Sequence, residues 1–221
     1  MQAARERAAV DFQKRVEAAI ETVVELQAAK GPSDKKPARA STTDAQARVM
    51  KMPDGGFRPG YNIQCAVAGS ELGGPRTVVS VRVTNIGSDM GSVTPMLADI
   101  ERRTAHLPTT LLADANHAAH ACITHATRRG VEVLIAVPKR EQNASAHAMP
   151  EIAAWRERMK TEDAKRAYRS RAGLCELVNA HLKSHHGTAH VLVRGLEKVT
   201  CVALLGALAN NLLAHATSLL G

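Results

Sequence analysis

The sequence TTLLADAN, residues 109–116, carries most of the information about the fold. Its apolar run ends at Asp114, a helix-like stretch follows to Arg129, and VEVLIAV at residues 131–137 is apolar and rich in β-branched residues. Strand, helix and strand in this order predict two parallel strands with a crossover helix, because a tight turn cannot join parallel strands. The fold class predicted from this unit is α/β.

The segments on either side extend this unit. YNIQCAVA at residues 61–68 and TVVSVRVT at residues 77–84 predict two neighbouring antiparallel strands around a turn at residues 69–75. The stretch 54–60 before them is dense in turn residues. Helices are predicted at Ser88–Arg103, at Pro150–His185 with a possible break near Thr161, and at Val199–Leu219.

The N-terminal part has a different character. Met1–Ala29 has apolar residues at helical spacing and contains neither Gly nor Pro, which predicts one amphipathic helix. Lys30–Ala47 is rich in Gly, Pro, Ser, Thr and charge, a composition typical of a poorly ordered linker. We therefore expect a helical arm and linker over residues 1–47 and a globular region over residues 48–221.

The charge balance favours a polyanionic partner. With 29 Lys and Arg against 21 Asp and Glu, the net charge is +8 and the pI is about 9.6, as expected of a protein that binds nucleic acid or an acidic membrane. Membrane binding has less support, because the longest apolar candidate, residues 199–220, is interrupted by Asn210, Asn211 and His215. The N-terminus lacks the apolar stretch of a secretory signal, so a cytoplasmic location is expected.

Asp114 is the first candidate site residue. A carboxylate at the carboxyl end of a strand points into the usual ligand crevice of an α/β sheet. An Asp in this position is also a common helix N-cap, and the residue alone does not separate the two interpretations.

A second candidate group lies on one predicted helix. Tyr168, Arg171, Glu176 and Lys183 place an acidic residue among cations, which suits a site for metal and phosphate, and Glu176 and Lys183 stand two turns apart on one face. The alternative is a solvated helix face with scattered ion pairs.

The order of several motifs separates these alternatives. RVMKMPDGGFRPGYNIQCAV, VTNIGSDMG, LLADANH, VPKR, the Tyr168 to Lys183 series and VRGLEKV follow one another between residue 48 and the C-terminus. In this order they resemble the DDE transposases of bacterial insertion sequences, in the ribonuclease H-like superfamily. The resemblance implies an incomplete ribonuclease H-like fold, a mixed sheet flanked by helices, for the C-terminal part of the catalytic domain.

The resemblance also implies roles for the candidate residues. Asp114 matches the second catalytic Asp and Glu176 the catalytic Glu, both as ligands of Mg²⁺ or Mn²⁺ in two-metal phosphodiester chemistry. Tyr168, Arg171 and Lys183 match residues that contact DNA. The implied partners are transposon ends and target DNA, with a possible homodimer as in transposition complexes.

Three features depart from the family pattern. Many members have one fewer residue between the Arg and the Glu, so that either Arg169 or Arg171 can fill the Arg position. A Gly-Tyr after the second Asp is replaced by Asn116-His117. The central strand that carries the family's first Asp has no counterpart here, which predicts a truncated form that is inactive alone.

Two other functions stay open at this stage. One is a non-catalytic DNA-binding remnant, because the basic charge does not depend on a complete catalytic site. The other is a metal-binding protein that uses the donors His117, His120, Cys122 and His125, although His125 falls off the helix face shared by the first two histidines. The four cysteines are widely scattered, so neither a disulfide framework nor a zinc knuckle is predicted.

Overall fold

The computed structural model of the chain describes residues 2–32, 35–52, 54–69, 74–139 and 149–220. These residues form two compact units, which are described separately. The first comprises residues 1–63, 83–87 and 190–203, and the second comprises residues 64–82, 88–189 and 204–221. Both α-helices and strands are present, so the prediction of a mixed α/β class is confirmed.

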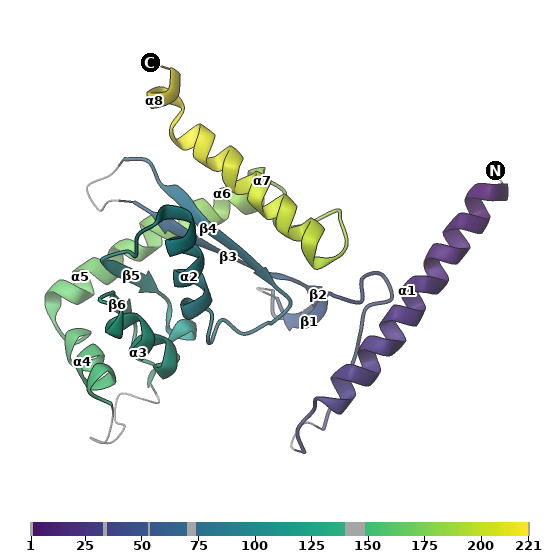
Figure 1. Ribbon diagram of the computed structural model, residues 1–221, viewed down its shortest axis with the longest axis horizontal. Coiled ribbons are helices and arrows are strands. Elements are labelled where there is room, and N and C mark those ends of the chain that lie inside the picture. The colour runs from purple at the N-terminus through teal and green to yellow at the C-terminus, as the bar shows by residue number, and fades with distance from the viewer. Residues whose placement is uncertain (1, 33–34, 53, 70–73, 140–148, 221) are drawn as a thin grey trace. The chain divides into compact units, whose positions relative to one another are not determined.

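The first unit contains the N-terminal helix and a small hairpin (Figure 1). Helix α1 covers Gln2–Ala28, as predicted, and Ala19 is its only buried residue among those described. The linker that follows contains no helix or strand in its described part, as predicted, but its end is held in place. The Asp44 carboxylate accepts hydrogen bonds from Tyr61 Oη and from the Gly195 backbone N–H.

The hairpin corrects one expectation. Strands β1 (Arg48–Lys51) and β2 (Phe57–Gly60) pair antiparallel, so residues 57–60 of the stretch 54–60 predicted as a turn form a strand. The turn is confined to the residues around Gly55, which has a positive φ of 83°. Pro59 is tolerated in β2 because the sheet has only two strands and Pro is compatible with an edge strand.

The second unit is built around the predicted parallel pair. Strands β5 (Thr110–Ala113) and β6 (Glu132–Ile135) pair in parallel, and helix α3 (His120–Arg128) joins them, so this prediction is confirmed. In Figure 1 the pair lies between α5 on one side and α2 and α3 on the other. The strands β3 (Asn62–Ala68) and β4 (Thr77–Thr84) pair with each other as predicted, although part of the turn between them lies outside the described residues.

The helices of this unit largely follow the predicted ranges. They are α2 (Val93–Thr104), α4 (Pro150–Arg158), α5 (Glu162–Arg171), α6 (Leu177–His185), α7 (Leu196–Ala214, shared with the first unit) and α8 (Ala216–Leu220). Helix α2 begins later than predicted because Gly91 has a φ of 90°, which lies outside the helical region. The break near Thr161 is confirmed, since Thr161 Oγ1 accepts the Ala164 N–H and caps α5.

One apolar cluster holds the second unit together. Trp155 of α4 is fully buried in this cluster, and its indole N–H donates to the Ile135 carbonyl at the end of β6 over 3.0 Å. Leu97 of α2 and Ile123 of α3 are fully buried there as well. Ala66 of β3 and Leu111 of β5 pack against the same cluster. The cluster therefore fixes the end of β5, where Asp114 follows.

Helix α7 is the one described helix that is long and apolar enough to cross a membrane. The core helices of soluble proteins can have the same length and composition. Its mean hydropathy is 1.3 over the best window, and its Asn210 is buried. Asn211 accepts a hydrogen bond from the Val78 N–H and donates one to the Val78 carbonyl. These two bonds attach the C-terminal part of α7 to the backbone of β4.

Candidate functional site

Asp114 stands directly after β5, as the sequence predicts, and it also caps a turn. Its Oδ1 accepts the Asn116 N–H over 2.8 Å, at the start of the short 3₁₀ helix η1 (Ala115–His117). The capping interpretation of this residue is therefore confirmed, and one carboxylate oxygen serves the cap. No hydrogen bond reaches the second oxygen from any described residue, and 41% of the side chain is exposed.

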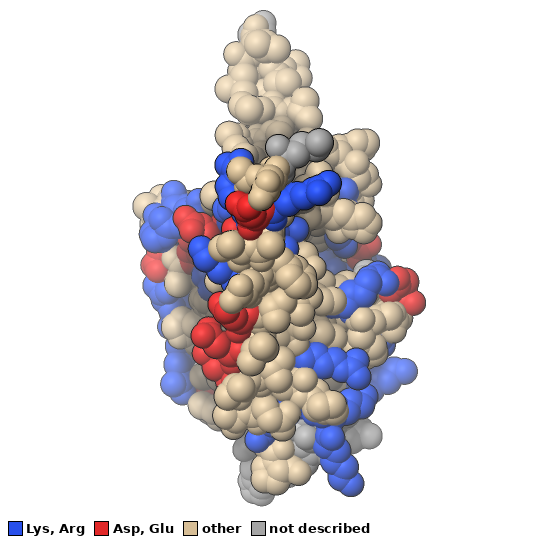
Figure 2. Space-filling view, turned by 90° about the vertical axis from the view of Figure 1, so that its right-hand side faces the viewer, with Lys and Arg blue, Asp and Glu red and all other residues tan. Residues whose placement is uncertain are grey.

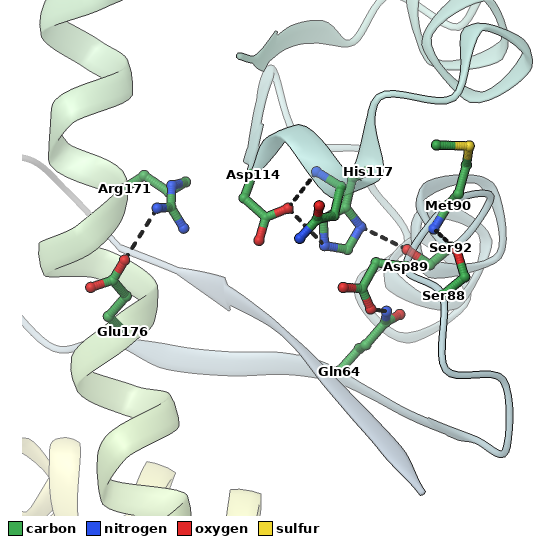
Figure 3. A network of polar contacts seen from close by, with 10 residues as sticks. Gln64, Ser88, Asp89, Met90, Ser92, Asp114, His117, Arg171 and Glu176 are labelled. Atoms are coloured by element: carbon green, nitrogen blue, oxygen red, sulfur yellow. Dashed lines mark hydrogen bonds and ion pairs between the residues drawn. The ribbon is translucent and has the colours of Figure 1, made fainter. Parts of the chain in front are cut away.

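The turn also carries His117, which lies next to Asp114. The Nε2 atom of His117 is 4.0 Å from Asp114 Oδ1, and its Nδ1 atom is 2.8 Å from the Ser92 hydroxyl. Ser92 stands at the N-cap of α2, yet its side chain makes no capping hydrogen bond. A chain of contacts therefore runs from Ser92 through His117 to Asp114 (Figure 3).

The carboxylate of Asp89, which precedes α2 in the chain, lies in the same view. Its Oδ1 accepts a hydrogen bond of 2.6 Å from the Gln64 side chain of β3. Its backbone carbonyl accepts the Ser92 N–H. These bonds shape the turn that positions Ser92.

The other candidate residues lie on one continuous helical segment that includes a π turn. Helix α5 ends at Arg171, the π turn η3 covers Ala172–Glu176, and α6 begins at Leu177. A π turn contains one more residue than the corresponding α turn. The additional residue that sets this chain apart from the resembled family is therefore accommodated between Arg171 and Glu176.

The π turn brings Arg171 and Glu176 into contact. In a regular α-helix, residues five apart point in different directions. Here Arg171 Nη2 lies 3.1 Å from Glu176 Oε1, and the Arg171 guanidinium carbon is 5.6 Å from the centre of the Tyr168 ring. Of the two arginines that could fill the family's Arg position, Arg171 makes these contacts, whereas Arg169 is exposed.

Helix α5 contacts both β5 and β6, so this helical segment and the end of β5 belong to one packed unit. Figure 3 shows the Arg171 guanidinium directed towards the side on which Asp114 lies, with Glu176 joined to it from below. Lys183 lies on α6, where it is exposed and has no ion-pair partner among the described residues. Tyr168, Arg171, Glu176 and Lys183 are thus presented by one element, as predicted.

The donors fit a divalent metal in kind but not in number. Carboxylate oxygens are suitable ligands for Mg²⁺ and Mn²⁺. Within the described ranges, however, no group of three or more His, Cys, Asp or Glu side chains is placed to hold a metal ion. In addition, Glu176 Oε1 already contacts a guanidinium.

The histidine and cysteine cluster considered as an alternative is not assembled. Cys122 is buried and accepts a hydrogen bond from Thr94 Oγ1, while His120 makes an edge contact with the Trp155 ring, 6.3 Å between centroids. His125 is exposed. These donors point to different surroundings because α3 spreads them around its circumference, so the prediction of one shared site is wrong for the described residues.

Comparison with known proteins identifies this region. Residues 117–214 match the family model described as Transposase DDE domain. The matched range contains η3 and both helices of the Tyr168 to Lys183 segment, and it begins three residues after Asp114. Neither the search of curated proteins nor that of solved structures returned a match. The resemblance found in the sequence is therefore confirmed over residues 117–214, which carry a DDE-type transposase domain.

Proposed function

We propose that the chain acts in transposition of an insertion sequence as the part of a DDE transposase that contacts DNA and contributes Asp114 and Glu176. The observation that carries this proposal is the π turn, which pairs Arg171 with Glu176 on a helix packed against β5. The same helix presents Tyr168 and Lys183. We further propose that residues 48–221 adopt a ribonuclease H-like arrangement, with residues 1–47 as an arm and linker.

Cleavage and strand transfer require more carboxylates than this site contains. When bound, two divalent ions activate the attacking oxygen and stabilise the leaving one during in-line displacement. Asp114 and Glu176 would be the ligands for Mg²⁺ or Mn²⁺ in this chain, and no third carboxylate joins them among the described residues. We therefore propose that these 221 residues do not cut DNA by themselves, as expected of a form that lacks the first catalytic Asp.

Binding depends on a different property, the positive charge. On the face shown in Figure 2, Lys and Arg side chains are scattered among uncharged ones without forming a single continuous patch. A dispersed net charge of +8 supports weak, sequence-independent contacts with phosphates. Lys183 is the best placed of the candidate cations, because Arg171 is held by Glu176 while Lys183 is exposed.

Salt-dependent binding to duplex DNA tests this proposal. Each phosphate contact that is lost flattens the slope of log affinity against log salt by about 0.9. Lys183→Ala should weaken binding several-fold at low salt and flatten that slope by about one contact. Lys160→Ala is the matched control, because it removes the same charge from the turn after α4, where Lys160 is paired with Glu157. Equal effects of the two variants would contradict a role for Lys183 beyond net charge.

The partners and location follow from this proposal. Transposon ends and target DNA are the proposed partners, and a homodimer is proposed because strand transfer joins two DNA ends. A cytoplasmic location agrees with a DNA substrate in bacteria. The alternative function, a non-catalytic DNA-binding remnant, predicts the same salt dependence. The two functions differ only in whether Asp114 and Glu176 bind the catalytic metal ions in a complete transposition complex.

A further inference from the structure

The turn after β5 places an imidazole where a carboxylate oxygen is already present. His117 Nε2 is 4.0 Å from Asp114 Oδ1, which is beyond the range of a direct hydrogen bond. Two ligand atoms about 2.1 Å from one metal ion stand roughly 3.0–3.4 Å apart in octahedral or tetrahedral geometry. The two atoms are therefore somewhat farther apart than two ligands of one metal ion, and they would have to move closer when an ion binds. A rotation of the Asp114 side chain, 41% of which is exposed, would cover the difference.

Ser92 fixes the imidazole in the orientation that such a site needs. Its hydroxyl lies 2.8 Å from His117 Nδ1, and this contact replaces the helix cap that a serine in this position usually provides. Metal-binding histidines commonly have their second ring nitrogen held in this way, which fixes the ring and the tautomer. When the Ser92 oxygen accepts the Nδ1 proton, the lone pair of Nε2 is directed towards Asp114.

Solvent reaches both donors, since 20% of the His117 side chain and 41% of the Asp114 side chain are exposed.

A nitrogen donor changes the metal preference of the site. Carboxylates suit Mg²⁺ and Mn²⁺, whereas imidazole suits Zn²⁺ and similar ions of borderline softness. We propose that Asp114 and His117 together bind one such ion, of the Zn²⁺ or Co²⁺ type, with Ser92 as the positioning residue and water completing the coordination.

This inference shares one point with the proposed function, on which it rests: both take the Asp114 carboxylate as a metal ligand. It adds a ligand, His117, and a class of metal that the carboxylates alone do not select. Among the described residues only two protein side chains contribute, so the affinity should be moderate, and the effect of each variant should be measurable as a change in affinity.

Titration of the metal-free full chain with CoCl₂, followed by visible absorption in the absence of DNA, tests the proposal. The chain should bind one Co²⁺, and a hundredfold excess of MgCl₂ should not displace it. His117→Gln and Asp114→Asn should each weaken binding at least tenfold, and Ser92→Ala should weaken it roughly tenfold, as is typical of residues that orient a ligand. His125→Gln is the matched control, because His125 is exposed on α3, and it should leave binding unchanged.

Three results would overturn the proposal: no stoichiometric Co²⁺ binding, unchanged binding by His117→Gln, or an equal loss in His125→Gln. Circular dichroism checks the fold of each variant. In His117→Ala, added imidazole should restore the cobalt absorption, which a folding defect would not allow. Because no DNA is present, loss of the cobalt site leaves the DNA-binding proposal standing, and loss of DNA binding leaves the cobalt site standing.

Discussion

At the scale of single residues, the carboxylate of Asp99 on α2 accepts hydrogen bonds from three side chains. Burial alone would raise the pKa of Asp99. Hydrogen bonds from Ser80, Arg102 and Arg103 outweigh that effect and lower the pKa from 3.8 to about 2. Ser80 is buried on β4, so the ionised Asp99 connects α2 to that strand.

The sign of the shift sets the pH dependence. A carboxyl group with a lowered pKa in the folded state stabilises the fold above its unfolded pKa, and this contribution is lost as the pH falls towards the folded pKa. Asp99→Asn should therefore lower the free energy of unfolding at pH 7 by about 2 kcal/mol. The difference from the wild type should shrink between about pH 4 and about pH 2.

Urea unfolding at several pH values measures this difference. Asp163→Asn is a suitable control, because Asp163 forms an exposed ion pair with Arg166 on α5 and such pairs contribute little. A constant difference between wild type and Asp99→Asn across the acid range would show that the lost stability does not come from the ionised carboxylate.

At the scale of elements, local patterns predicted most of the secondary structure. The apolar run at 109–113 and the β-rich run at 131–137 were sufficient for the parallel pair, because their hydrophobic periods differ from that of the helix between them. The hairpin strand at 57–60 was missed because its Gly and Pro content is typical of turns. The π turn was missed because a pattern of residue types shows spacing but not the hydrogen bonding of the backbone.

Two relationships depend on contacts that no local pattern contains. The β3–β4 and β5–β6 pairs pack against the same apolar cluster, yet no ladder joins them among the described strands. The second relationship is the contact of His117 with Ser92, which lies 25 residues away in the sequence and comes together with it only in the folded chain.

Deletion of Gly173 tests the interpretation of the π turn. Gly173 is exposed, and a Cβ atom there would meet nothing within 4 Å. Its removal should convert η3 into a regular α turn that keeps Arg171 and Glu176 in contact, now four residues apart. The melting temperature should be unchanged or raised, because a glycine inside a helix costs about 1 kcal/mol relative to alanine.

Deletion of Ala180 is the matched control for this experiment. Ala180 is also exposed, but it lies in the regular helix α6, where losing one residue rotates everything beyond it by about 100°. The buried Leu182 would leave its place, and the melting temperature should fall. If both deletions lower the melting temperature equally, the interpretation of the π turn as one additional residue within a helix is wrong.

At the scale of the whole molecule, DNA binding and DNA cleavage depend on different properties of the chain. Binding follows from charge that is spread over the chain, whereas cleavage follows from a small set of carboxylates in one place. The chain has a net charge of +8, and no group of three or more metal-binding side chains is placed together among its described residues. Replacing Asp114 should therefore affect metal binding and leave DNA binding intact or slightly stronger, since one negative charge is removed.

Nicking of supercoiled plasmid DNA by the purified chain is the most direct test of this central claim. With Mg²⁺ or Mn²⁺ at low salt, the chain should bind the plasmid. The amount of open-circular product should not exceed the amount formed with Asp114→Asn. Metal-dependent nicking that Asp114→Asn abolishes would contradict this claim. A third carboxylate of this chain would then have to complete the site, and Asp89, which lies close to His117 in Figure 3, would be the first to replace.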